Sequence, residues 1–183
     1  MIPHTPFYFL RHGETDWNLA RKMMGVADIP LNATGRAQAE SARRQTADLG
    51  LKSIVASPLS RAWETAEIVS RGLGLALAPM VDLREVDVGP LQGTSDRGWM
   101  DRWYAGEAQA GVEPFNEFCQ RIARGLTLAL ELAQPALIVS HGGVFRAMEK
   151  VIGLSTGSDI PNATLARVDP PPAERGSWRI MLI

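Results

Sequence analysis

Cysteine is nearly absent from the 183-residue chain, since Cys119 is the only one. A single cysteine excludes a disulfide framework within the chain, a cysteine-based zinc site and a CxxC redox pair. It favours a reducing, cytoplasmic setting. Because Cys119 falls among the apolar positions of an expected helix, we predict that it is packed in the core and is not reactive.

Charge of one sign is missing as well, because 19 lysines and arginines stand against 20 aspartates and glutamates. A net charge of -1 provides no field that would collect nucleic acid or lipid head groups, so we expect neither partner. No window of about 18 uninterrupted apolar residues exists to span a membrane. The first apolar run, Phe7 to Leu10, is ended by Arg11 and is too short for a secretion signal.

What the chain does contain is enough apolar material for a core, with 45% hydrophobic residues. That length and composition predict a single domain over residues 1–183. Short β-rich runs alternate with longer segments of helical period. This alternation predicts an α/β fold in which a mostly parallel sheet is sandwiched between helices.

The individual elements follow from local patterns. Expected strands cover residues 7–10, 53–57, 75–81, 136–140, 165–168 and 178–183. Expected helices cover residues 34–49, 60–73, 114–129 and 144–152. The stretch 94–111 is rich in glycine and aromatic residues and shows no clear period, so we expect a short helix within a loop there.

Three expected strands are followed at once by residues suited to hold an anion. These sequences are RHG at 11–13, SPLSR ending in Arg61, and HGG at 141–143. Ligands of open α/β sheets bind beyond the carboxyl ends of the parallel strands. We therefore expect two of the chain's three histidines and two arginines to meet at one edge of the sheet.

Such a cluster suits a phosphoryl group. The guanidinium groups of Arg11 and Arg61 offer planar pairs of donors that match phosphoryl oxygens. Helix N-termini near Arg61 and Gly142 would add backbone N–H groups, and Gly13, Gly142 and Gly143 would let the backbone approach the anion. One histidine, kept neutral by the arginines, could attack phosphorus while the other donates a hydrogen bond.

Cleavage of a phosphomonoester also requires a proton for the departing oxygen, and a carboxylic acid near the dianion can supply it. Glu85, in the segment DLREVDVGPLQG, is the candidate for this acid. Asp82, Asp87 and Glu113 are neighbouring carboxylates that leave the assignment open.

The segments LRHGETDWN, SPLSRAWETA, LREVDVGPLQG and VSHGG resemble the four signature segments of the histidine phosphatase superfamily, in its phosphoglycerate-mutase-like group. The resemblance implies a phosphohistidine intermediate on His12. It also implies that Arg11, Arg61 and His141 bind the phosphoryl group and that Glu85 is the acid. No metal and no organic cofactor are implied.

The resemblance covers about residues 7–153 and extends to the substrate side of the site. Thr15 and Asn18 match positions that line the same pocket in relatives. The residues expected to contact the substrate are Arg11, Gly13, Thr15, Asn18, Met24, Arg61, His141 and Gly142.

Two departures from the family pattern favour hydrolysis over transfer within the substrate. Relatives that act as mutases carry Arg-His-Tyr after the acid glutamate, where this chain has VDV at 86–88. The FQG or FSG segment of relatives is MMG at 23–25 here, so a polar contact at Met24 is missing. We expect a metal-independent phosphomonoester hydrolase that acts on a small phosphorylated substrate with an apolar body.

Other functions remain as alternatives. Phosphoglycerate mutase-type phosphoryl transfer is one, and a catalytically inactive module that binds a phosphorylated ligand is another. A serine hydrolase with Ser140 as nucleophile is disfavoured, because Ile138 stands where its turn needs glycine. Trp99 and Trp103 either line the substrate pocket or cap the core. The oligomeric state stays open, a homodimer included.

Overall fold

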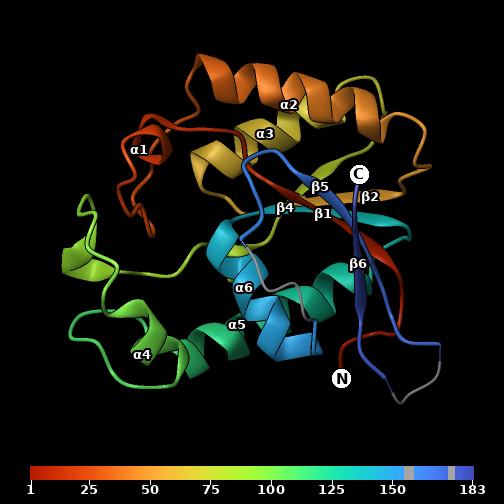
Figure 1. Cartoon of the computed structure of the whole chain (residues 1–183). Coiled ribbons are helices and arrows are strands. Elements are labelled where there is room, and N and C mark those ends of the chain that lie inside the picture. The colour runs from red at the N-terminus through yellow and green to blue at the C-terminus, as the bar shows by residue number, and fades with distance from the viewer. Residues whose placement is uncertain (155–158, 173–175) are drawn as a thin grey trace.

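The structure is a computed structural model of the chain, and it describes residues 1–154, 159–172 and 176–183 (Figure 1). Within these residues, six strands form one sheet in the order β3-β2-β4-β1-β5-β6. The strands are β1 (Phe7–Arg11), β2 (Ser53–Ala56), β3 (Leu77–Pro79), β4 (Ala136–Ser140), β5 (Leu165–Asp169) and β6 (Arg179–Leu182). Strands β1 to β4 run parallel, whereas β5 and β6 are antiparallel additions at one edge.

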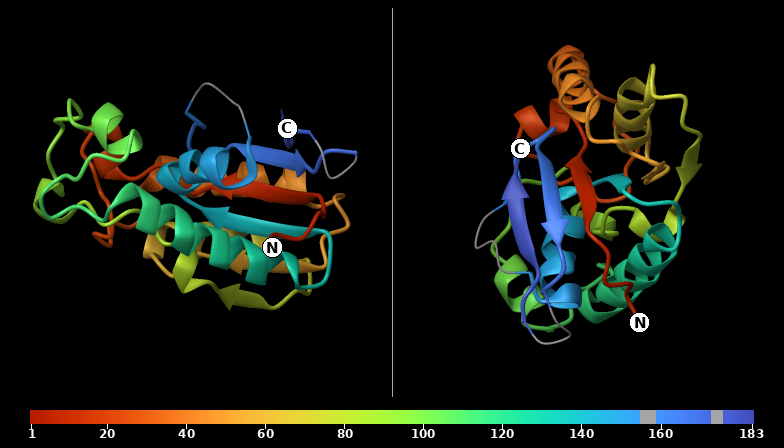
Figure 2. Two further views of the ribbon diagram at one scale, coloured as in Figure 1. Left: turned by 90° about the horizontal axis from the view of Figure 1, so that it is seen from below. Right: turned by 90° about the vertical axis from the view of Figure 1, so that its right-hand side faces the viewer.

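Helices cover both faces of this sheet, as the sequence predicts. The helices are α1 (Asp16–Leu19), α2 (Ala33–Thr46), α3 (Ser60–Ser70), α4 (Met100–Tyr104), α5 (Phe115–Leu130) and α6 (Gly142–Ile152). Figures 1 and 2 show α2 and α3 on one face and α5 and α6 on the other. Helices α1 and α4 lie beyond the carboxyl ends of the parallel strands (Figure 1). Single 3-10 turns occupy Val81–Leu83 and Gly89–Leu91. The predicted α/β class is therefore confirmed.

Alternation along the central strands divides the core into two layers. Phe7 and Phe9 of β1 pack with residues of α5 and α6, whereas Tyr8 and Leu10 pack with residues of α2 and α3. All five residues of β4 are buried. A parallel strand covered on both faces needs such a continuous apolar run. Cys119, which belongs to α5, is also buried in this core, as predicted.

Most element bounds differ from the predicted ones by only a few residues, and the larger differences have a physical reason. Helices α2 and α3 end at Thr46 and Ser70, three residues before the predicted ends. Leu49 and Leu73 still pack against the core from the turns that follow, so the apolar period continues past each helix. The four-residue helix α1 escapes prediction because one turn has no period.

Strand β3 is shorter than predicted, and helix α6 begins two residues earlier. The short helix expected within 94–111 is α4. Part of the turn predicted before the last strand lies outside the described residues. Within the described residues, no helix is both long and apolar enough to cross a membrane.

The loop after β1 is held by an unusually close contact with α2. A Cβ atom added to Gly35, in the first turn of α2, would overlap the backbone carbonyl oxygen of Glu14. In a helix interior, alanine is more favourable than glycine by about 1 kcal/mol. At this position the contact opposes that preference.

We predict that Gly35→Ala lowers the free energy of unfolding by about 1–3 kcal/mol, the usual range for overpacking. Denaturant unfolding monitored by circular dichroism measures it. A stabilised variant would mean that helix propensity dominates and that the loop after β1 does not lie against α2 as described.

Candidate active site

Parallel pairing of β1 with β4 brings two distant histidines together. Arg11 lies opposite Ser140 in the register, so the residues that follow, His12 and His141, leave the sheet side by side. Their ring centroids are 5.2 Å apart, and the backbone N–H of His12 donates to the carbonyl of Ser140. Both side chains are buried, at 1% and 0% exposure. The juxtaposition expected from the strand ends is therefore present.

Arg61 lies in the first turn of α3, after β2, and is completely buried. Its Nη1 and Nη2 atoms donate to the carbonyls of Ala27 and Gly25, at 2.9 and 2.8 Å. Arg11, at the end of β1, donates from Nη1 to the carbonyl of Ile160 at 2.6 Å. These carbonyls fix the orientation of both guanidinium groups.

Three buried nitrogen atoms of this cluster have no hydrogen-bond partner among the described residues. They are Nε of Arg11, Nε of Arg61 and Nδ1 of His141. An unsatisfied buried donor is costly, so a cluster of them calls for an explanation. An oxyanion bound between them would accept hydrogen bonds from these nitrogen atoms.

His12 is held neutral in one tautomer. Its Nδ1 atom lies 2.7 Å from the carbonyl oxygen of Gly13, an acceptor, so Nδ1 carries the proton and Nε2 has a free lone pair. Burial lowers the pKa of His12 well below its ordinary value, and the charges of Arg61 and Arg11 lower it further. The side chain has the protonation state that a nucleophile requires.

His141 is also neutral and is oriented by a serine. Burial lowers the pKa of His141 well below its ordinary value, with Arg61 and His12 adding to the effect. Its Nε2 atom lies 2.7 Å from the hydroxyl of Ser57. If Ser57 donates to Nε2, the proton of His141 is on the unpartnered Nδ1 atom. Ser57 was not predicted, although it begins the segment SPLSR.

Glu85 lies next to the two guanidinium groups. Burial lowers the pKa of Arg11 and that of Arg61, the latter to about 10, while the charge of Glu85 opposes both shifts. The Glu85 carboxylate accepts from the backbone N–H groups of Val86 and Gly143, at 3.0 and 3.1 Å. Both arginines remain cationic at neutral pH.

The other carboxylates considered for the acid are bound elsewhere. Glu113 pairs with Arg121, and Asp82 makes a long contact with Arg124. Glu113 and Asp87 line a different hollow, together with Arg84 and Arg121. Of these four carboxylates, Glu85 alone lines the cavity to which Arg11 and Gly142, the chain neighbours of the two histidines, also contribute. His12, His141 and Arg61 themselves are not among its lining residues.

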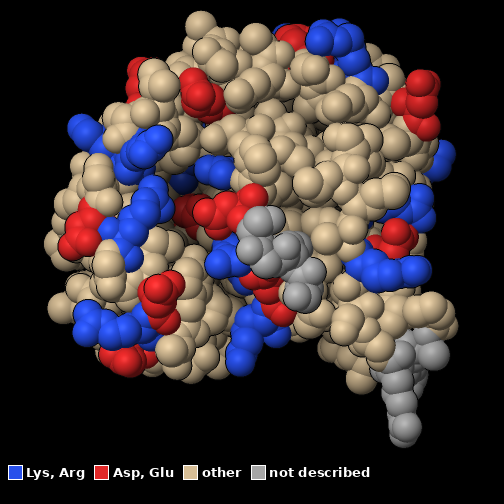
Figure 3. All heavy atoms as spheres, viewed as in Figure 1, with Lys and Arg blue, Asp and Glu red and all other residues tan. Residues whose placement is uncertain are grey.

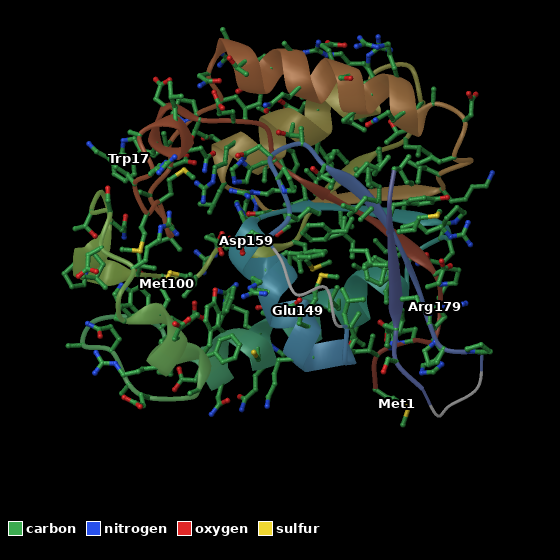
Figure 4. All side chains as sticks on the ribbon, viewed as in Figure 1. Met1, Trp17, Met100, Glu149, Asp159 and Arg179 are labelled. Atoms are coloured by element: carbon green, nitrogen blue, oxygen red, sulfur yellow. The ribbon has the colours of Figure 1, made fainter. Side chains whose placement is uncertain are left out.

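That cavity has a volume of about 150 Å³. It is smaller than the ~300–1,000 Å³ of most small-molecule sites, so a substrate larger than a small phosphoester must extend through its mouth. Figure 3 shows basic and acidic side chains around a hollow left of centre on this face. Met100 and Asp159, labelled in Figure 4, both line it.

The wall of the cavity is mixed, with an apolar part and a charged part. It includes Met23, Met24, Val88, Trp99, Met100 and Trp103. Trp99 and Trp103 are at the same time buried in the main core cluster. These tryptophans therefore both line the cavity and pack in the core. Lys22, Arg97, Arg146 and Asp159 supply charges at the lining.

Some predicted contact residues have a different role in the structure. Thr15 is completely buried and does not line the cavity. Its hydroxyl caps α1 by accepting from the backbone N–H of Asn18, and it also contacts the sulfur of Met24. Asn18 and Met24 do line the cavity. Thr15 thus positions its neighbours.

The three glycines contact protein groups. An added Cβ at Gly13 would overlap the carbonyl of Gly35, and one at Gly142 would lie 3.3 Å from Cζ of Arg11. An added Cβ at Gly143 would overlap the carboxylate of Glu85. Their small size is required by these contacts, whereas the sequence had suggested contact with an anion.

One backbone N–H at each of the two helix N-termini is bound by a carboxylate of the protein. At α3 the backbone N–H of Ser60 donates to Asp28, and at α6 that of Gly143 donates to Glu85, at 2.7 and 3.1 Å. A carboxylate of the protein thus accepts a hydrogen bond from one backbone N–H at the start of each helix.

Asn162 is a further residue that sequence patterns missed. Its amide nitrogen lies 3.1 Å from the carbonyl of His12, 3.3 Å from that of Gly13 and 3.2 Å from Oδ1 of Asn18. It therefore ties the end of β1 to the cavity wall. A lone asparagine in an irregular segment carries no periodic signal. Among the described residues, no group of histidine, cysteine and carboxylate side chains could hold a metal ion.

Residues 7–174 match the sequence model of the histidine phosphatase superfamily (branch 1), and the chain belongs to this family. The "Uncharacterized phosphatase PhoE" of Bacillus subtilis is 39% identical over 79% of this chain and 75% of its own length. The "Probable phosphoglycerate mutase GpmB" of Salmonella typhi is 31% identical over 88% of this chain and 83% of its own.

Solved structures agree on the fold. A mycobacterial glucosyl-3-phosphoglycerate phosphatase in complex with VO3 has a TM-score of 0.82 at 25% identity, covering 97% of this chain and 96% of its own. A phosphoglycerate mutase from Thermus thermophilus has a TM-score of 0.75 at 31% identity, with the same coverage. Both phosphatases and mutases thus share this architecture.

Burial of two neutral histidines makes stability depend on pH. The unfolded chain protonates each histidine below about pH 6.5, whereas the folded chain does so only at the lower pKa of the buried group. The stability that comes from keeping both histidines neutral is therefore fully present above about pH 6.5 and is lost as the pH falls below that value. We predict that the free energy of unfolding falls by up to about 1.4 kcal/mol per pH unit per histidine.

Denaturant unfolding of wild type and His12→Gln between pH 7 and pH 5 tests this. The variant should lose stability with a slope that is smaller by about one proton. Equal slopes for the two proteins would show that His12 already titrates normally in the folded state.

Proposed function

We propose that the protein is a phosphomonoesterase that acts through a phosphohistidine intermediate on His12. One observation carries this proposal: a neutral histidine with a free Nε2 adjoins three unpartnered donors, from Arg11, Arg61 and His141. These donors suit the non-bridging oxygens of a phosphoryl group. Membership of the histidine phosphatase superfamily supports it.

In the first step, Nε2 of His12 attacks phosphorus and forms an N–P bond while the bond to the leaving oxygen breaks. Glu85 gives its proton to that oxygen, so the alcohol departs neutral. Arg11, Arg61 and the Nδ1–H of His141 stabilise the charge on the other three oxygens.

In the second step, water attacks phosphorus and the N–P bond breaks. The carboxylate of Glu85 takes the proton of that water, so Glu85 returns to its starting acid form. Inorganic phosphate then leaves, and His12 is again neutral. Atoms and charge balance over the two steps without a metal or an organic cofactor.

The cavity wall supports hydrolysis over mutase-type transfer. A mutase must hold the dephosphorylated substrate until it takes the phosphoryl group back, which requires polar contacts to the rest of a small acid. Here Val86 and Val88 follow the acid, and Met23, Met24 and Trp99 continue the wall. This part of the wall suits a small phosphoester with an apolar body, while Lys22, Arg97 and Arg146 place positive charge elsewhere on the lining. Likeness to the mycobacterial phosphatase supports the same choice.

Trapping of the intermediate tests the proposal directly. Brief incubation with a 32P-labelled phosphomonoester, followed by alkaline quenching, should leave label on the wild-type protein. The label should be stable to alkali and labile to acid, and His12→Ala should carry none. Retention of label by His12→Ala would place the nucleophile elsewhere, and a wild type that carries no label would favour an inactive binding module.

Parallel assays separate hydrolysis from transfer. We expect measurable turnover of p-nitrophenyl phosphate and negligible isomerisation of 3-phosphoglycerate. Substantial isomerisation with little phosphate release would instead identify a mutase.

We predict that Glu85→Gln lowers kcat for alkyl phosphates by about 100-fold or more, because the poor leaving group needs a proton. The effect on p-nitrophenyl phosphate should be several-fold at most, since p-nitrophenolate departs without one. Steady-state kinetics on the two esters measures the difference. Equal losses on both esters would remove Glu85 from the acid role.

A further inference from the structure

One arginine of α5 forms hydrogen bonds with the backbone of the segment that carries Glu85. Arg121 donates from Nη1 to the carbonyls of Asp82 and Arg84, at 2.9 and 2.8 Å. Its Nη2 atom lies 3.3 Å from the carbonyl of Glu85 itself. A single guanidinium group therefore contacts three carbonyls within four consecutive residues.

Glu113 fixes that guanidinium group from the other side. Its two carboxylate oxygens accept from Nε and Nη2 of Arg121 at 2.9 and 2.8 Å, in a bidentate ion pair. The side chains of Arg121 and Glu113 are only 13% and 18% exposed. Arg121 also stacks on Phe118, with Cζ 4.9 Å from the ring centroid. Partial burial and two-point geometry make this pair stiffer than a surface ion pair.

The same glutamate continues the attachment past Glu85. A carboxylate oxygen of Glu113 lies 3.2 Å from the backbone nitrogen of Asp87, and its own N–H donates to the Asp87 carbonyl at 2.8 Å. The carbonyl of Glu113 accepts from the indole nitrogen of Trp103 in the cavity wall, at 2.9 Å. The pair thus links the backbone on both sides of Glu85 to the wall that would contact the leaving group.

The carboxylate of Glu85 depends on this attachment. The hydrogen bonds described for it come from two backbone N–H groups, of which Val86 belongs to the same segment. Among the described residues, the hydrogen bond from Gly143 is the only one that ties the carboxylate to another element. The position of the acid is therefore set largely by where its backbone is held.

We infer that Arg121 and Glu113 are positioning residues for proton donation by Glu85. Their hydrogen bonds to the backbone of residues 82–87 hold Glu85 in place. This inference rests on the proposed acid role of Glu85. Neither residue touches the reacting atoms. A displacement of about 1 Å in a reacting group can lower a rate by about 100-fold, so loss of the pair should act on the step that needs the proton.

Arg121→Lys is the variant that tests this. Lysine keeps the charge but cannot make the bidentate contact and reach the carbonyls at once. We expect kcat for an alkyl phosphate to fall by about 10- to 100-fold, and that for p-nitrophenyl phosphate by less than about 3-fold. Inhibition by inorganic phosphate should be unchanged, because Arg11, Arg61 and His141 are untouched.

Arg124→Lys is the matched control. Arg124 lies three residues further along α5 and is 60% exposed, and its hydrogen bonds within the described part of the chain go to the side chain of Asp82, at 3.4 and 3.5 Å. Arg124→Lys should leave the kinetics on both esters unchanged. Glu113→Gln provides a second variant if Arg121→Lys is poorly folded, as judged by its Tm, and should show the same selectivity between esters.

A double mutant separates positioning from a general structural role. Adding Arg121→Lys to Glu85→Gln should cause no further change in the ratio of the rates on the two esters, because the proton donor is already absent. If Glu85→Gln is selective but Arg121→Lys slows both esters equally, or neither, the positioning role is overturned and the proposed acid stands. If Glu85→Gln itself is not selective, the acid assignment fails and the inference fails with it.

Discussion

The parallel pairing of β1 with β4 is the constraint on which the site depends. Its register sets Arg11 opposite Ser140, and the next residues on each strand are His12 and His141. Neither strand could slip by one residue without reversing which face of the sheet its apolar side chains cover. The two burial layers that lock the strands in register therefore also fix the separation of the two imidazole rings at 5.2 Å between centroids.

Burial at this point has an electrostatic consequence. Removing Arg11, Arg61 and two histidines from water disfavours every charged form, whereas the charge of Glu85 raises the pKa of both arginines. The histidines become neutral. What results is a buried space with positive charge, unpartnered donors and a free imidazole nitrogen, which is an environment suited to a tetrahedral dianion.

Much of the site could be predicted because its main residues follow strands with clear patterns. His12 and His141 come directly after β1 and β4, and Arg61 lies in the first turn of the helix that follows β2, where α/β sheets place ligands. Ser57 and Asn162 could not be predicted, because a single polar residue in an irregular segment has no periodicity. The contacts of Arg121 and Glu113 likewise depend on long-range packing. In the fold, helix ends were the least predictable, since apolar spacing continues into the turns.

A crystal structure with orthovanadate bound would test the central claim most directly. Vanadate takes a five-coordinate form that resembles phosphoryl transfer. The account predicts a vanadium atom bonded to Nε2 of His12, with its oxygens within hydrogen-bond distance of Arg11 Nε, Arg61 Nε and His141 Nδ1. Vanadate bound elsewhere, or bound here with His12 turned away from it, would contradict the account.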